Sequence, residues 1–194
     1  MLIFWERRLV FLATPKAGST AIEAALEGLA NLAVQRPAEL KHTDFRTFRQ
    51  FIAPWLQSAT GDAFTTVALM REPLSWLQSW YRFRQRDDQD DPAHPMTGVS
   101  FAEFARLYAS GTPGSLADVG SQSGFLTDDT SRVDRIFRYE DMEAFTDFLE
   151  DRLDCALRLP HINVPPAADV TLNADQHSDL MQALEADLAI YRAL

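Results

Sequence analysis

Residues 9–29 read LVFLATPKAGSTAIEAALEGL, which is an apolar run, a turn with one glycine and an amphipathic stretch. The run Val10–Ala13 is of the kind that fills a buried parallel strand. Apolar residues then recur at i, i+3, i+4 and i+7, the spacing of one helix face, at Ile22, Ala25, Leu26 and Leu29. This stretch predicts a strand, a turn and a helix, with those four side chains facing the core.

The turn between strand and helix, residues 14–20, has the composition of an anion-binding loop. A turn that opens a helix offers free backbone N–H groups at the positive end of the helix dipole. Gly18 lets the backbone approach an anion closely, and Ser19 and Thr20 add hydroxyl donors. Lys16 adds a mobile positive charge. The turn therefore predicts a site for the phosphate or sulfate of a nucleotide, although an ordinary turn with a solvated lysine is the alternative.

The order of residues in this turn distinguishes it from the phosphate loop of ATP-binding proteins. The ATP-type loop needs G-x-x-x-x-G-K-[ST], whereas here the lysine lies two residues before the single glycine. The order P-K-x-G-[ST]-[ST] instead resembles the 5′-phosphosulfate loop of sulfotransferases that use 3′-phosphoadenosine 5′-phosphosulfate (PAPS). The resemblance implies that Lys16, Ala17, Gly18, Ser19 and Thr20 bind the 5′ end of PAPS.

A second segment carries the same resemblance. Residues 64–70, FTTVALM, predict another buried strand, which ends at Arg71. Pro73 suits the first turn of a helix, and Ser79 follows two turns later. The pattern R-x-P…S-x-Y is similar to the 3′-phosphate element of sulfotransferases, which implies that Arg71 and Ser79 hold the 3′-phosphate. In the alternative, Arg71 ends a strand and the serine faces water.

The third matching segment lies near residue 140. Residues 133–142, VDRIFRYEDM, resemble the strand that ends in "YED" or "YEN" and precedes a helix, and residues 159–163 resemble an L-P-x-x-N ending. The resemblance therefore spans Leu9 to Asn163.

The chain also departs from the family pattern at two places. Ala21 stands where small-molecule sulfotransferases usually have tryptophan, and no C-terminal Arg-Lys-Gly element is present. The chain is closer to carbohydrate and bacterial sulfotransferases.

These segments predict one α/β domain over residues 1–194, with a parallel sheet between two layers of helices. By resemblance this is a P-loop-like nucleotide-binding fold of the sulfotransferase type, with the nucleotide at the carboxyl ends of the strands. A further strand is expected at residues 32–34. Helices are expected at 45–56, at 100–108 behind a Ser100–Glu103 capping box, and from Asn173 to Tyr191.

The activity implied by the resemblance is transfer of a sulfuryl group from PAPS to a hydroxyl or amine of a small-molecule or carbohydrate acceptor. Lys16 is then expected to neutralise the leaving oxygen, without a metal. His42 follows the second predicted strand and is the candidate base, because an imidazole accepts protons near neutrality. Glu72 is the second candidate, and a surface role for His42 stays open.

Two other function classes fit parts of the sequence. One is a kinase-like phosphoryl-transfer enzyme, and the other is a module that binds PAPS or adenosine 3′,5′-bisphosphate (PAP) without turnover. The net charge of −10 argues against general nucleic-acid binding, which needs Lys and Arg against phosphates. No apolar run reaches the roughly 18 residues of a membrane span. The N-terminus lacks the order of a signal peptide, so a cytoplasmic protein is expected.

Overall fold

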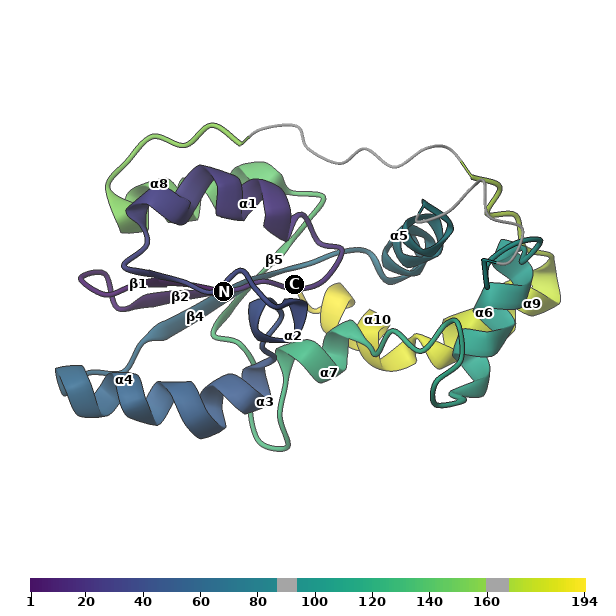
Figure 1. The fold of residues 1–194 in the computed structure, drawn as a ribbon, viewed down its shortest axis with the longest axis horizontal. Helices are drawn as coiled ribbons and strands as arrows, with labels where there is room; N and C mark the ends of the chain where they lie inside the picture. The colour runs from purple at the N-terminus through teal and green to yellow at the C-terminus, as the bar shows by residue number, and fades with distance from the viewer. Residues whose placement is uncertain (87–93, 160–167) are drawn as a thin grey trace. The chain divides into compact units, whose positions relative to one another are not determined.

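The computed structural model describes residues 1–86, 94–159 and 168–194 (Figure 1). The chain forms two compact units. The first contains Met1–Arg71, Gln122–Ile162 and Leu194, and the second contains Glu72–Ser121 and Asn163–Ala193. That residues 1–194 make one domain stays a prediction.

The first unit is built on a mixed five-stranded sheet with the order β3-β1-β2-β4-β5. Its strands are β1 (Leu2–Phe4), β2 (Leu9–Leu12), β3 (Leu32–Ala33), β4 (Thr65–Met70) and β5 (Arg135–Arg138). β4 is parallel to both β2 and β5, as expected. The prediction of a wholly parallel sheet is wrong, because β1 is antiparallel to β2 and β3.

The antiparallel part of the sheet follows from a tight connection. Residues 5–8 join β1 to β2, and the N–H of Arg8 donates to the carbonyl of Trp5 at 3.3 Å. Arg8 has a φ of 49°, which turns the chain back without a glycine. So short a connection allows only an antiparallel neighbour, because a parallel one needs a long crossover.

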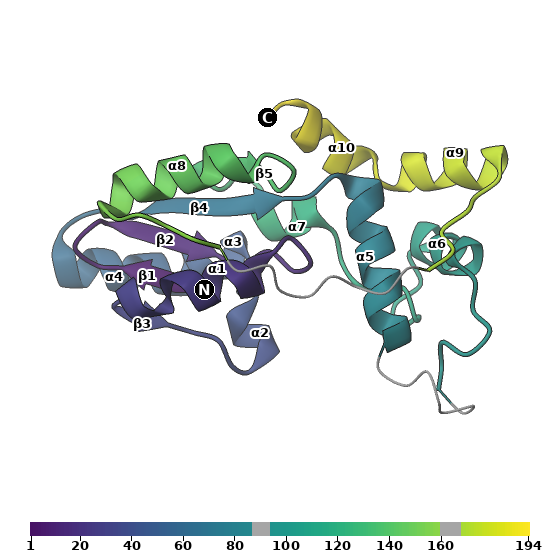
Figure 2. The ribbon, with the colours of Figure 1, turned by 90° about the horizontal axis from the view of Figure 1, so that it is seen from above.

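Helices flank this sheet (Figures 1 and 2). The helices α1 (Ser19–Leu26) and α8 (Met142–Leu153) cover one face. On the other face lie α3 (Phe45–Thr47), the π-helical turn Phe48–Ile52 and α4 (Ala53–Thr60). The α/β class is therefore confirmed, and the expected helix at 45–56 extends to Thr60 with a π-helical middle.

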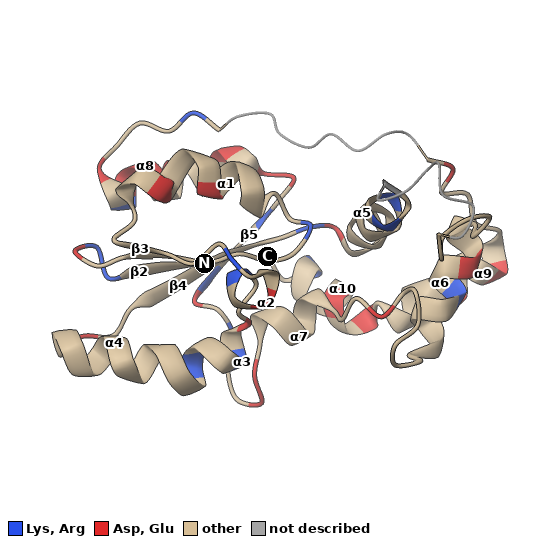
Figure 3. Cartoon of the chain, in the orientation of Figure 1, with Lys and Arg blue, Asp and Glu red and all other residues tan. Residues whose placement is uncertain are grey.

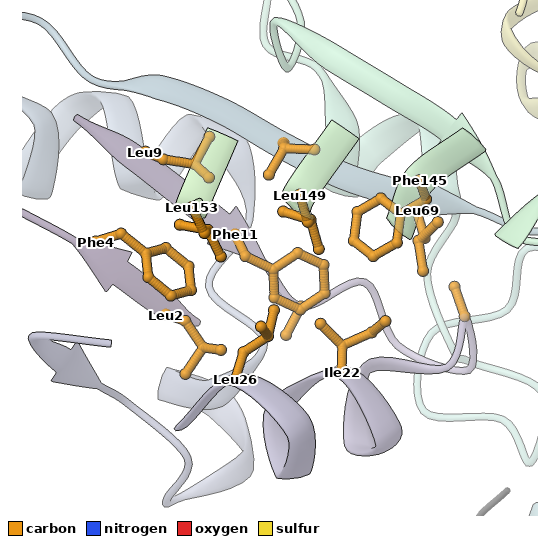
Figure 4. Packing of buried hydrophobic residues seen from close by; sticks show 13 residues of the cluster. Leu2, Phe4, Leu9, Phe11, Ile22, Leu26, Leu69, Phe145, Leu149 and Leu153 are labelled. Carbon is orange, nitrogen blue, oxygen red and sulfur yellow. The ribbon is translucent and has the colours of Figure 1, made fainter. Parts of the chain in front are cut away.

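The core of the first unit lies between the sheet and the helices α1 and α8 (Figure 4). Alternate residues of the strands point into it, because successive side chains of a strand lie on opposite faces of the sheet. Its central members include Phe11, Ile22, Leu69, Phe145 and Leu149. Leu29 was expected to join them, but it is 49% exposed. α1 ends at Leu26 and a 3₁₀ turn, Glu27–Leu29, follows, so the helical spacing no longer places residue 29 on the buried face.

Two short helices complete the first unit, α2 (Ala38–Lys41) and α7 (Gln122–Leu126). The second unit is helical, with α5 (Pro73–Arg86), α6 (Phe101–Ser110), α9 (Ala174–Ala183) and α10 (Glu185–Arg192). Its buried cluster comes from all four helices and includes Trp76, Leu77, Phe104, Leu180 and Leu188.

Sequence signals for helix ends in the second unit are partly confirmed. Asn173 and Gln176 form the expected reciprocal capping box. The hydroxyl of Ser100 accepts the N–H of Glu103, but the Glu103 carboxylate pairs with Arg106 at 2.7 Å instead of closing the box. The single C-terminal helix expected from Asn173 to Tyr191 is divided at the buried Leu184.

Acidic residues outnumber basic ones, 28 to 18, and Figure 3 shows several of them on α8 and α10. Within the described ranges, no helix has both the length and the apolar character that crossing a membrane requires.

Candidate functional site

The candidate site begins in the turn after β2. The sheet ends at Leu12, and α1 begins at Ser19 with Gly18 as its N-cap. Lys16 and Gly18 both adopt left-handed backbone, with φ angles of 61° and 78°. Gly18 also has a packing reason, because a Cβ there would lie 2.8 Å from Cε2 of Tyr139. The turn is therefore shaped by one lysine in left-handed backbone and by one glycine at which any Cβ would force Tyr139 to move.

The turn leaves backbone donors unused. The Gly18 carbonyl accepts the N–H groups of Ala21 and Ile22. In contrast, Ala17, Gly18, Ser19 and Thr20 donate no backbone N–H bond to any residue in the described part of the chain. The hydroxyl of Thr14, which is 1% exposed, is likewise buried without a hydrogen-bond partner there. Unpaired donors at the positive end of a helix are the groups that bind a phosphate or sulfate.

Arg71 lies directly after β4, and its backbone is held by Gln122. The buried amide of Gln122 accepts the N–H of Arg71 at 2.9 Å and donates to its carbonyl at 2.8 Å. Gln122 is the first residue of α7 and lies 51 residues after Arg71 in the sequence. This pair of bonds continues the hydrogen bonding of β4 past its end, so the start of the arginine side chain is fixed.

The side chain of Arg71 reaches the turn after β2. Its Nη1 donates to the carbonyl of Lys16 at 3.4 Å, and its guanidinium lies over the Tyr139 ring, 5.0 Å from the centroid. Tyr139 follows β5 and donates its N–H to the carbonyl of Met70 at 2.8 Å. The carboxyl ends of the three parallel strands therefore bring Lys16, Arg71 and Tyr139 together. Ligands of open α/β sheets bind at this edge.

His42 also lies at this edge. Its Nδ1 is 2.6 Å from the carbonyl of Ala13, the residue after β2. A carbonyl accepts only, so Nδ1 carries the proton and Nε2 has the free lone pair. Burial lowers the pKa of His42 below 6.5, so the ring is neutral at neutral pH. A neutral imidazole with a free Nε2 beside the loop is able to accept a proton.

The other predicted site residues lie on α1, in α5 and at the start of α5. Ser19 is buried in the first turn of α1, whereas Thr20 is exposed. Ser79 is buried in α5, in the second unit, so its convergence with Arg71 on one phosphate stays a prediction. Glu72, the alternative base, accepts the N–H groups of Leu74 and Ser75 and so caps α5.

Two further histidines, His94 and His177, belong to the second unit. His94 accepts the N–H of Met96 through Nδ1, and His177 is exposed on α9. His161 and Asn163 lie outside the described residues.

Sequence reasoning missed two contributors. Gln122 gives no signal, because a single glutamine before a short helix belongs to no pattern. Tyr139 was noticed only as part of the third segment, and neither its contact with Gly18 nor that with Arg71 is readable from sequence.

Comparison with known protein families, curated proteins and solved structures finds no match to this chain.

Proposed function

We propose that this protein is a PAPS-dependent sulfotransferase with the P-loop-like fold of that superfamily. One observation carries the proposal: the guanidinium of Arg71 donates to the carbonyl of Lys16. The loop matched to the 5′-phosphosulfate and the arginine matched to the 3′-phosphate are thus adjacent, although 55 residues separate them in sequence. A nucleotide with phosphate on both ends of its ribose needs both groups in one site.

The chain's own groups have distinct roles in this proposal. The backbone N–H groups of residues 17–20 and the hydroxyls of Ser19 and Thr20 bind the 5′-phosphate. Arg71, with Ser79 from α5, binds the 3′-phosphate. Lys16 stabilises the negative charge that develops on the bridging oxygen when the sulfur–oxygen bond breaks. Tyr139 keeps the arginine in place through its ring.

The acceptor side is assigned to His42. Its Nε2 takes the proton of the acceptor hydroxyl or amine as the new bond to sulfur forms, and PAP leaves with the electrons of the broken bond. A base with a pKa below 6.5 is in its active form throughout the neutral range. The acceptor as a small molecule or carbohydrate, and the cytoplasmic location, belong to the same proposal.

Calorimetric titration tests the nucleotide. We expect PAP to bind, and to bind more tightly than ATP·Mg²⁺. Tighter binding of ATP·Mg²⁺ contradicts the proposal in favour of a kinase-like enzyme. An assay with ³⁵S-labelled PAPS and a panel of sugars, phenols and amines then tests turnover. If PAP binds but no acceptor is sulfated, the protein is a binding module and the catalytic part of the proposal is wrong.

A further inference from the structure

A cluster of charges beside His42 has a buried carboxylate, Glu23, at its centre. Glu23 projects from α1 and is 3% exposed. Its Oε2 is 2.7 Å from Nζ of Lys41, and its Oε1 is 3.3 Å from the α-amino group of Met1. A buried carboxylate is costly unless it is paired, and here two cations pair with it. Glu23 therefore ties α1, the helix that the phosphate loop opens, to the end of α2.

The same cluster leads to His42. Lys41 ends α2 and His42 is the next residue. The Met1 amine also donates to the carbonyls of Lys41 and Val34, both at 3.0 Å. The backbone N–H of His42 donates to the carbonyl of Ala38 at 2.9 Å. Both the side chain and the carbonyl of Lys41 are thus held, and the histidine ring that follows reaches the carbonyl of Ala13.

We propose that Glu23 is a positioning residue for His42: through its ion pair with Lys41, it holds the imidazole on the loop. This inference rests on the proposed function, because it gives a role to the base of that reaction. The sequence placed Glu23 on an amphipathic helix without any function. In the structure it is the buried counter-charge between the phosphate loop and the proposed base.

The charges around His42 shift its pKa in opposite directions, which makes the proposal testable. Three influences lower the pKa of His42: burial, the positive charge of Lys41 and that of the Met1 amine. The negative charge of Glu23 and the hydrogen bond to Ala13 raise it. Burial lowers the pKa of the Met1 amine, so this group loses its positive charge at a lower pH than an exposed amine does. Removing the carboxylate and removing the lysine should therefore move the same pKa in opposite directions.

The experiment is an NMR titration of the His42 ring protons in the full chain, with Glu23→Gln and Lys41→Met as variants. Glu23→Gln should lower the pKa of His42, and Lys41→Met should raise it. The double variant should return the pKa toward the wild-type value. Glu39→Gln is the matched control, because Glu39 is an exposed carboxylate on α2, the same helix as Lys41, and is not among the groups that shift the pKa of His42. It should leave the titration unchanged.

The pH profile of kcat/KM is the second readout. The acid limb should move to lower pH in Glu23→Gln and to higher pH in Lys41→Met, while the Kd for PAP stays unchanged. A merely structural glutamate would change thermal stability in both variants without these opposite shifts. If both variants shift the His42 pKa in the same direction, or neither shifts it, the proposal is overturned.

The same variants distinguish a folding defect from a loss of function. Should Glu23→Gln fail to fold, Lys41→Met tests the lysine through which Glu23 acts, because this substitution leaves Glu23 paired with Met1; a His42 pKa that does not rise in Lys41→Met overturns the proposal. If the pKa shifts occur but PAPS is never consumed, the proposed activity is wrong while the electrostatic coupling stands. If PAPS is consumed and the pKa does not move, the activity stands and the role of Glu23 is wrong.

Discussion

The Arg71 guanidinium lies over the ring of Tyr139, 5.0 Å from its centroid, and the same ring fills the space where a Cβ on Gly18 would lie. One aromatic side chain after β5 therefore touches both the arginine after β4 and the glycine after β2. A cation over an aromatic face is worth about 0.5–1 kcal/mol at exposed sites. The larger consequence is geometric, because the shape of the loop and the position of the arginine depend on each other.

Gly18→Ala should destabilise the protein and weaken PAP binding. The left-handed conformation costs a non-glycine residue about 1–2 kcal/mol. At Gly18 the new methyl group also meets Tyr139 at 2.8 Å, so the ring must move. Gly61→Ala is the matched control, since Gly61 has the same φ of 78° and nothing within 4 Å of a Cβ. Urea unfolding should show a larger loss of unfolding free energy for Gly18→Ala than for Gly61→Ala. Equal losses in the two variants would mean that the contact with Tyr139 is unimportant.

Arg71→Ala should remove discrimination between PAP and 5′-AMP. A ligand at about 100 times its Kd stabilises the folded state by roughly 2.7 kcal/mol. In the wild type, PAP should give a larger thermal shift than AMP at matched concentrations, because only PAP carries a 3′-phosphate. Arg135→Ala provides the control, since Arg135 is exposed at the opposite end of its strand, β5. Equal shifts with PAP and AMP in the wild type would contradict the 3′-phosphate assignment.

Gln122→Met should weaken both stability and PAP affinity. Methionine has a similar shape but leaves the N–H and carbonyl of Arg71 without the amide. An unsatisfied buried polar group costs about 1–3 kcal/mol. Gln182→Met, at an exposed position on α9, controls for the change of residue type. Unfolding in urea and titration with PAP measure the two effects. Unchanged PAP affinity would show that Gln122 supports the fold and not the position of Arg71.

Much of the first unit was predictable because its signals are local. The apolar runs of β2 and β4 and the helical spacing of α1 and α8 each lie within about 12 residues. β1 was missed for a physical reason. Its turn at Trp5–Arg8 contains no Gly, Pro or Asn, and reverses through a left-handed arginine instead. Without a turn signal, residues 2–4 gave no reason to expect a hairpin.

The candidate site was predictable only in part, because its partners come from distant segments. Lys16, Gly18 and Arg71 each follow a strand, so the rule that parallel strands share a carboxyl edge predicted that they meet. Gln122 and Glu23 act through contacts that span 51 and 18 residues, to Arg71 and to Lys41, and no periodic pattern marks them. A glutamate on an amphipathic helix is usually a solvated residue, whereas this one is buried because two cations face it.

Lys16→Ala and Lys16→Gly together should separate the amine from the loop conformation. Both variants lose the amine, so both should lose turnover, on the order of 10²–10³-fold, as when one transition-state donor is removed. Their stabilities should differ. The left-handed φ of 61° strains alanine by about 1–2 kcal/mol, which exceeds the roughly 0.5–1 kcal/mol entropic cost of glycine. Lys16→Gly should therefore be the more stable variant.

Single-turnover kinetics with PAPS and urea unfolding measure these two effects of the Lys16 variants. Retention of PAP binding in both is expected, because the backbone donors of residues 17–20 remain. If Lys16→Gly restored the wild-type rate, the lysine would matter for backbone shape only, and its catalytic role would be wrong.

His42→Asn should flatten the dependence of stability on pH between about pH 5 and about pH 8. The folded state lowers the pKa of His42 below the 6.5 of an unfolded chain. Between those two values the unfolded chain binds more protons, so the free energy of unfolding falls as the pH falls through this window. The neutral ring makes its full contribution to the free energy of unfolding above about pH 6.5. This contribution is lost at pH values below the pKa that His42 has in the folded protein.

Urea unfolding of wild type, His42→Asn and the exposed control His177→Asn measures this slope. The Met1 amine also titrates with a lowered pKa, but it does so in every variant and cancels in the difference. The destabilisation caused by His42→Asn should thus be larger at about pH 8 than at about pH 5. Asparagine can still donate to the carbonyl of Ala13, so the loss reports the titration rather than the hydrogen bond. A difference that is constant with pH would mean that folding does not lower the pKa of His42, and a difference that grows toward acid would mean that folding raises it; either result contradicts the buried, neutral imidazole.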